Sequence, residues 1–228
     1  MKLSQLILGT VASLGFITQA HAVAVTGGQT SVLLDLDTLA SVGLELSGVG
    51  GGTILPGNLG DSSVAFAINA RDASSPSLPT TFQYTVDTIA PFSGTIEHTG
   101  TVLFNSDSLE IGNFTIGFDP ERVGEMASGF FIADNVTFPG VALFDTMISG
   151  AVTATESQLI VPTDLLVSPE LADVLGNLEL TGADVGDALV EATARATAVP
   201  EPGTLGLMIG SLSLLGLAAR RRSRPSQR

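Results

Sequence analysis

The chain has 228 residues, a formal net charge of −14, one tyrosine, and neither cysteine nor tryptophan. Without cysteine it has no disulfide, no thiol nucleophile and no thiolate metal site, so packing must stabilise the fold. Between residues 23 and 199 there are 22 acidic residues, three arginines and no lysine; nucleic acid and anionic membrane surfaces are therefore poor partners, because phosphates are bound mainly through Lys and Arg.

The N-terminal residues are typical of a secretory signal peptide. Lys2 is followed by an apolar stretch over residues 6–17 and then by Ala20-His21-Ala22, a small-x-small cleavage pattern. We expect residues 1–22 to direct the chain to the secretory translocon and to be removed by signal peptidase. The mature chain then begins at Val23.

Residues 23–190 are predicted to form one extracytoplasmic all-β domain, because apolar side chains recur at every second position and turn residues bound each run. Residues 48–52 and 74–79 are expected to be loops. The number of short strands predicts a β-sandwich-like fold or a partly open barrel. The expected strands are 31–37, 42–47, 64–68, 82–86, 94–105, 114–118, 129–133, 141–145, 150–155, 158–161 and 184–192.

One segment of this domain is predicted to be helical. Ser168 is a favourable N-cap, Pro169 suits the first helical position, and Gly176 suits the residue after the helix. The sequence therefore predicts one helix of about two turns. Its apolar side chains lie on one side and are expected to seal an open end or edge of the sheet: Leu171, Val174 and Leu175.

A second targeting pattern lies near the C-terminus. Residues 191–199 are small and polar, which predicts a linker. They lead into Val199-Pro200-Glu201-Pro202, an uncharged apolar run over residues 203–219, and Arg220-Arg221-Arg222. The run would be about 26 Å long as a helix, barely enough to cross a bilayer, and the arginines would stop transfer on the cytoplasmic side.

This order of short motif, apolar span and basic tail over residues 200–228 resembles the PEP-CTERM sorting signal of Gram-negative bacteria. The resemblance implies processing by an exosortase, a membrane-embedded cysteine protease. It also implies a precursor anchored in the inner membrane, later delivery to the cell surface or extracellular matrix, and association with exopolysaccharide in a biofilm.

Candidates for catalysis are few in the mature domain. His98 is its only histidine, so a His-rich metal site cannot form, and a structural role is expected for His98 rather than that of a general base. Carboxylate pairs occur at Asp35 with Asp37, at Glu121 with Glu125, and at Asp184 with Asp187. A glycosidase needs two carboxylates facing each other across a sugar, and nothing in the sequence places such a pair in a cleft.

Calcium prefers oxygen ligands from Asp, Asn and backbone carbonyls. Asn105, Asp107, Asp134 and Asn135 are candidate ligands at expected loop positions. The chain has no Asp-x-Asp-x-Asp-Gly loop, which favours ordinary turn residues. The metal content is left open by the sequence.

A second resemblance covers residues 92–192. The segment from Gly94 to Phe104, Leu109-Glu-Ile-Gly-Asn-Phe-Thr-Ile and Ala142-Leu-Phe-Asp145 are similar to the β-rich HtaA haem-transport domain. In that family a tyrosine ligates the haem iron and a histidine supports it. The chain offers only Tyr84, which precedes the resembling stretch, and His98 for those roles.

Together these features predict a non-enzymatic, exported cell-envelope or matrix protein without a cofactor, sorted by an exosortase and associated with exopolysaccharide. The alternatives are a surface module that binds haem or calcium, and a secreted hydrolase.

Overall fold

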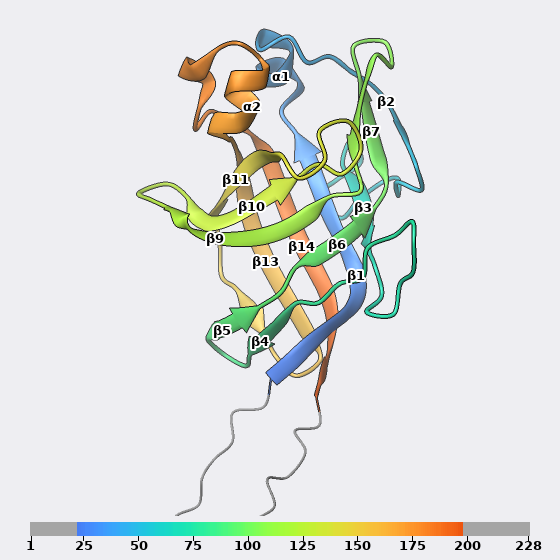
Figure 1. Ribbon diagram of the computed structural model, residues 1–228, viewed down its shortest axis with the longest axis vertical. Helices are drawn as coiled ribbons and strands as arrows, with labels where there is room; N and C mark the ends of the chain where they lie inside the picture. Colours follow the sequence, from blue (N-terminus) through green and yellow to red (C-terminus); the bar gives the residue numbers. More distant parts are fainter. Residues whose placement is uncertain (1–21, 198–228) are drawn as a thin grey trace, which may run out of the picture.

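The computed structural model describes residues 22–197, which form a β-barrel with short helices at one end (Figure 1). All strand pairs are antiparallel, and β14 pairs with both β1 and β13, which closes the ring. The barrel strands, in spatial order, are β1 (Ala22–Leu34), β3 (Val64–Ile68), β6 (Ile96–Thr99), β9 (Thr115–Val123), β10 (Ser128–Ala133), β11 (Ala142–Ile148), β13 (Gln158–Val167) and β14 (Asp184–Ala196).

Smaller strands extend this barrel. The hairpin of β4 (Gln83–Thr85) and β5 (Ile89–Ser93) pairs with the start of β1, and β12 (Thr153–Ala154) pairs with β13. A separate three-stranded sheet contains β2 (Leu46–Gly50), β7 (Thr101–Phe104) and β8 (Leu109–Gly112). The all-β prediction is confirmed, and of the two architectures expected the structure has a barrel, which is closed.

The longest seam joins β1 to β14, from Val23 opposite Ala196 to Leu34 opposite Gly186. Thr197 extends it by donating from its backbone N–H and its hydroxyl to the carbonyl oxygen of Ala22, at 3.0 and 2.6 Å. Both ends of the described chain therefore leave the barrel side by side, at the end away from the helices (Figure 1).

The other end of the barrel carries α1 (Leu36–Ser41), α2 (Pro169–Val174) and a 3-10 turn (Leu178–Leu180) (Figure 1). The predicted helix is confirmed as α2, with the Ser168 hydroxyl accepting from the N–H of Leu171 at 2.9 Å. The same hydroxyl donates to the carbonyl of Ala142 at 2.7 Å, which fixes α2 to β11. Arg122 of β9 adds a second tie, because it pairs with Asp145 of β11 at 2.8 Å and with Glu170 of α2.

Several predicted boundaries were wrong. The strand expected over 31–37 ends at Leu34, because Asp35 caps α1 and accepts from the backbone N–H groups of Asp37 and Thr38. Residues 48–50, expected to be a loop, belong to β2. The expected linker at 191–199 begins later, because residues 191–196 complete β14 and pair with β1 and, in part, with β13.

The seam between β1 and β14 depends on a glycine. Gly28 has a φ of +115°, and a Cβ there would meet the Glu191 carbonyl and lie 2.8 Å from the Ala192 Cα. Both the conformation and the close approach exclude a side chain at this position.

We predict that Gly28→Ala destabilises the protein by at least about 2 kcal/mol, because backbone strain adds to a clash with β14. Gly124→Ala is the control, since a Cβ at Gly124 meets nothing within 4 Å. Urea unfolding of both variants measures the difference. Equal stability of the two variants would contradict the assigned register of the seam.

Candidate functional site

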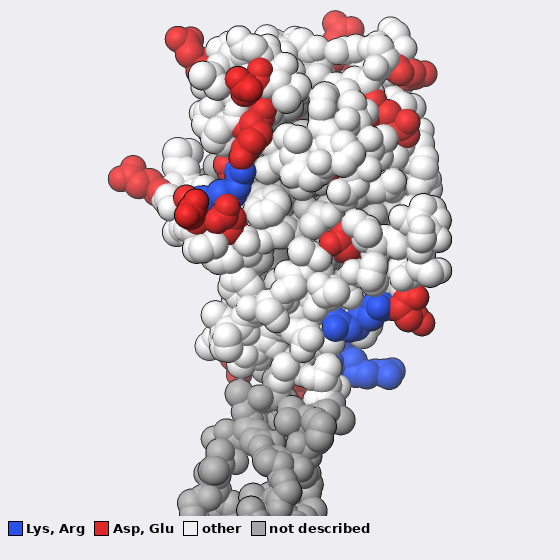
Figure 2. All heavy atoms as spheres, viewed as in Figure 1, with Lys and Arg blue, Asp and Glu red and all other residues white. Residues whose placement is uncertain are grey.

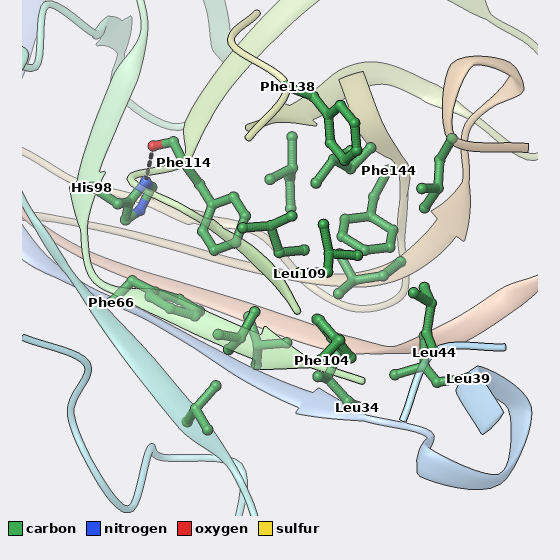
Figure 3. A pocket seen from close by; sticks show the side chains of 18 of the residues that line it. Leu34, Leu39, Leu44, Phe66, His98, Phe104, Leu109, Phe114, Phe138 and Phe144 are labelled. Atoms are coloured by element: carbon green, nitrogen blue, oxygen red, sulfur yellow. Dashed lines mark hydrogen bonds between the residues drawn. The ribbon is translucent and has the colours of Figure 1, made fainter. Parts of the chain in front are cut away.

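The barrel interior holds two small apolar cavities, one nearer each end. The first, here called the capped cavity, has a volume of about 60 Å³ and lies beneath α1 and α2. Figure 3 shows Phe104, Leu109, Phe138 and Phe144 around this cavity, with His98 at its edge. The helical residues expected to seal one end of the sheet system take part in its wall: Leu171, Val174 and Leu175.

The second, here called the rim cavity, has a volume of about 70 Å³ and lies toward the end of the barrel where the chain termini leave. Its walls include Phe82, Phe130, Ile148 and Leu159. Three residues line both cavities and so form the partition between them: Thr30, Ile116 and Ile132.

A polar pair lies at this partition. His98 of β6 is 3% exposed; its Nδ1 lies 2.9 Å from the Phe114 carbonyl oxygen and its Nε2 lies 2.8 Å from the Thr30 hydroxyl. A carbonyl can only accept, so Nδ1 carries the proton and the Thr30 hydroxyl donates to Nε2. Burial lowers the pKa of His98 to about 4, against the raising effect of the Phe114 carbonyl. The ring is therefore neutral and satisfied, which is typical of a structural histidine.

Tyr84 lies in a different part of the barrel. Its hydroxyl lies 2.5 Å from the Thr155 carbonyl oxygen and 3.0 Å from the Gln158 carbonyl oxygen, which share its one proton, and burial raises its pKa to about 12. These contacts tie the β4–β5 hairpin to Thr155, which follows β12, and to Gln158, the first residue of β13. Tyr84 is thus a structural residue that links sheet elements.

The structure does not bring Tyr84 and His98 together. Tyr84 pairs with Val23, whereas His98 contacts Thr30, which lies seven residues further along the same strand. That separation is roughly 20 Å at about 3.3 Å per residue. The phenol and the imidazole are also occupied by their own hydrogen bonds, so this pair does not fit the haem roles implied by the HtaA resemblance.

The expected calcium ligands are engaged within the protein. Both carboxylate oxygens of the fully buried Asp134 accept from backbone N–H groups, namely those of Gly112, Val136, Thr137 and Phe138, at 2.6–3.2 Å.

The other three candidate ligands also have protein partners. Asn105 bonds to the backbone at Gly43 and Glu45. Asp107 accepts from Ser47, and Asn135 donates to Asn113 and Thr115. Over residues 22–197 the structure places no group of three acidic or histidine side chains suited to a metal ion.

The carboxylate pairs named from the sequence have separate roles. Asp35 is the N-cap of α1, and the backbone N–H of Thr38 lowers its pKa. Asp187 lies opposite Asp164 across β13 and β14. Its pKa is raised by burial and by the charges of Asp164 and Asp184.

Glu121 and Glu125 are exposed around the β9–β10 turn. Neither interior cavity is lined by any of these paired carboxylates. A surface hollow beside α1 is lined by Asp35, Asp37 and Asp187, and Asp35 is engaged there as the N-cap of α1.

Sequence reasoning missed Thr30 and the partition that it forms with His98. The contact joins positions 68 residues apart, so no local pattern marks it. Asp134 was noticed as an oxygen ligand, and its actual role was missed. The signal that could have found it is the Asp-x-x-Thr spacing, because an Asp side chain commonly accepts from N–H groups two and three residues later.

The residues predicted to direct sorting lie outside the described part of the chain: Val199, Pro200, Glu201, Pro202, Arg220, Arg221 and Arg222. Ala20 also lies outside it, whereas Ala22 is the first residue of β1. Within residues 22–197 no helix is both long and apolar enough to cross a membrane. The predicted span at 203–219 lies outside the described residues.

Comparison with known proteins identifies the sorting signal. Residues 198–222 match the family model described as the PEP-CTERM protein-sorting motif, which implies an exported, membrane-anchored precursor processed by an exosortase. No curated protein matches the chain. Among solved structures, the C-terminal domain of HtaA from Corynebacterium glutamicum aligns with a TM-score of 0.44 and 15% identity, over 75% of this chain and 99% of that domain.

We predict that Asp134→Asn destabilises the protein by about 2 kcal/mol, because an amide NH₂ cannot accept from the backbone N–H groups that face it. Asp61→Asn is the control, since Asp61 is exposed. Thermal unfolding at constant pH measures both. A control that loses as much as Asp134→Asn would contradict the structural role.

A further prediction concerns pH. Because the pKa of His98 is about 4 when folded and about 6.5 when unfolded, the unfolded chain takes up a proton first as pH falls. Stability is therefore lost progressively between pH 6.5 and pH 4. Between pH 7.5 and pH 5 the loss from this residue is on the order of 2 kcal/mol.

The variant His98→Asn removes the titrating group while keeping an N–H donor. Urea titrations at pH 7.5 and pH 5 should show a smaller loss of stability on acidification for this variant than for the wild type. Equal losses would show that His98 is not the group responsible.

Proposed function

We propose that this chain is an exported cell-envelope protein whose barrel is displayed outside the inner membrane and then released from its anchor by an exosortase. The observation that carries the proposal is the sorting motif at residues 198–222. It follows directly after β14, whose last residue is Ala196. A chain with this arrangement delivers a folded barrel, with the sorting signal at one end of it.

The geometry of the barrel supports an orientation for display. The two described ends lie at the same end of the barrel, and Pro200 is four residues beyond Ala196, a reach of at most about 14 Å. We propose that this end faces the membrane. The end that carries α1 and α2 then points away from it.

The role proposed for the displayed barrel is non-enzymatic, as a component of an exopolysaccharide or biofilm matrix. The region from 23 to 199 carries a formal charge of −19. In Figure 2, most acidic side chains on the visible face lie toward the helical end, with wide uncharged areas between them. Carboxylates directed away from the membrane suit a hydrated matrix in which divalent cations bridge acidic groups.

We predict that replacing Pro200, Glu201 and Pro202 with alanine blocks processing. Wild-type protein isolated from its host should lack both residues 1–22 and the arginine tail, whereas the variant should lose the signal peptide and retain its residues through Arg228. Intact mass of the inner-membrane and outer fractions measures this. The control replaces Pro120 and Glu121 with alanine, because they form an exposed Pro-Glu pair within β9.

The same fractions test the matrix role. Wild-type protein should co-purify with exopolysaccharide and be released by a calcium chelator. If wild type and variant are both full-length in the inner membrane, the sorting proposal is wrong. If processing is correct but the released protein does not associate with polysaccharide, sorting stands and the matrix role is wrong.

A further inference from the structure

A cluster of four phenylalanines lies at the rim cavity, and two of them, Phe82 and Phe130, line it. The rings of Phe92, Phe118 and Phe130 lie 4.8–5.1 Å apart between centroids, and Phe82 lies 5.9 Å from Phe92 and 6.3 Å from Phe130. They come from β5, β9, β10 and the residue before β4. Phe118 is 38% exposed, so the cluster extends from the barrel interior to solvent.

Two isoleucines also line this cavity, the exposed Ile148 and the half-buried Ile89. Ile148, at the end of β11, lines the cavity and is 43% exposed. Ile89, the first residue of β5, also lines it and has a φ of +57°. A β-branched residue rarely adopts this conformation, and such strain is frequently found where a protein contacts a ligand. Ile89, Ile148 and the phenylalanine cluster are here called the rim.

The rim cavity offers no free polar partner. Its lining contains no charged residue, and its only polar side chains are three threonines. Each has a hydrogen bond within the protein: Thr30 to His98, Thr146 to the Phe130 carbonyl, and Thr163 to the Ala188 carbonyl. A cavity of this kind does not hold water well and accepts apolar molecules instead.

The volume of the cavity and the charge of the protein limit the class of ligand that can bind. The cavity volume of about 70 Å³ compares with about 10–15 Å³ needed for one water by the same measure. The space therefore suits a short chain of carbon atoms. An anionic head group would lie next to a protein with a formal charge of −19 between residues 23 and 199 and would be repelled.

We propose that the rim cavity binds the alkyl chain of a neutral molecule, which enters past the rim and ends at the partition formed by Thr30, Ile116 and Ile132. The alkyl chain packs against rim side chains that are otherwise exposed to solvent. Removing it from water supplies the favourable free energy of binding. A head group without charge stays outside, beside Ile148 and Phe118. This binding activity goes beyond the sorting and matrix roles and does not depend on them.

Photo-crosslinking of the full chain tests the proposal. The probe is a neutral decanol carrying a diazirine near its alkyl terminus, and peptide mass spectrometry locates the labelled residues. Label is expected in β1, β9 and β10, the strands that supply the partition, and excess decanol should remove it, whereas decanoate should compete about tenfold less well because its charge is repelled. Label in residues 203–219 reports only the affinity of an apolar segment for the probe.

Two variants distinguish binding in the cavity from nonspecific adsorption of the probe to the protein surface. Each replaces an exposed β-branched residue with aspartate. Ile148→Asp places a carboxylate at the rim and should reduce the competed label about tenfold. Val123→Asp makes the same change at a residue that is 57% exposed and does not line the cavity, and should leave the label unchanged. A third variant, Val161→Phe, fills the cavity from β13 and should also remove the label.

Absence of competed label in β1, β9 and β10 of the wild type would overturn the proposal. Equal loss in Ile148→Asp and Val123→Asp would overturn it as well, because binding would then follow surface charge rather than the cavity. Each variant is compared with the wild type by thermal unfolding, so that loss of label is scored only for folded protein.

Discussion

The pairing of β1 with β14 is the constraint on which the rest of the structure depends. These strands lie at opposite ends of the described chain, and their register runs from Val23 opposite Ala196 to Leu34 opposite Gly186. Because β14 also pairs with β13, this seam turns an open sheet into a closed barrel and removes its two edges. In the sequence, the sorting motif begins two residues after Ala196, the last residue of β14.

Closure gives the barrel an interior that its side chains do not completely fill. Apolar residues line two cavities, and the few polar groups that reach them are paired inside the protein, above all Thr30 with His98. One end is covered by α1 and α2, and Tyr84 ties down the other. The exposed rim at Ile148 and Phe118 remains as the apolar approach to the interior. The same closure underlies both proposals, display from one end of the barrel and binding of a ligand at the rim.

Local signals in the sequence were sufficient for β3 and for α2, since alternation and an N-cap involve residues close together in the chain. α1 was missed because Leu34, Leu36 and Asp35 continue the alternation of β1, although Asp35 is a favourable cap. Closure and the Thr30–His98 contact could not be predicted, because each joins residues far apart with no pattern that marks the partner. Residues 191–196 are small and polar, which suggested a linker; their pairing with β1 outweighs that composition.

Hydrogen exchange of the backbone amides tests the closed barrel most directly. If the seam between β1 and β14 holds the fold together, the amides of residues 29–34 and 186–191 should exchange together, at the slowest rate in the protein and with the free energy of global unfolding. Exchange of these amides through an easier local opening, while β9, β10 and β11 stay protected, would contradict the account. The barrel would then be an open sheet in solution, with β14 free to separate alongside the sorting signal.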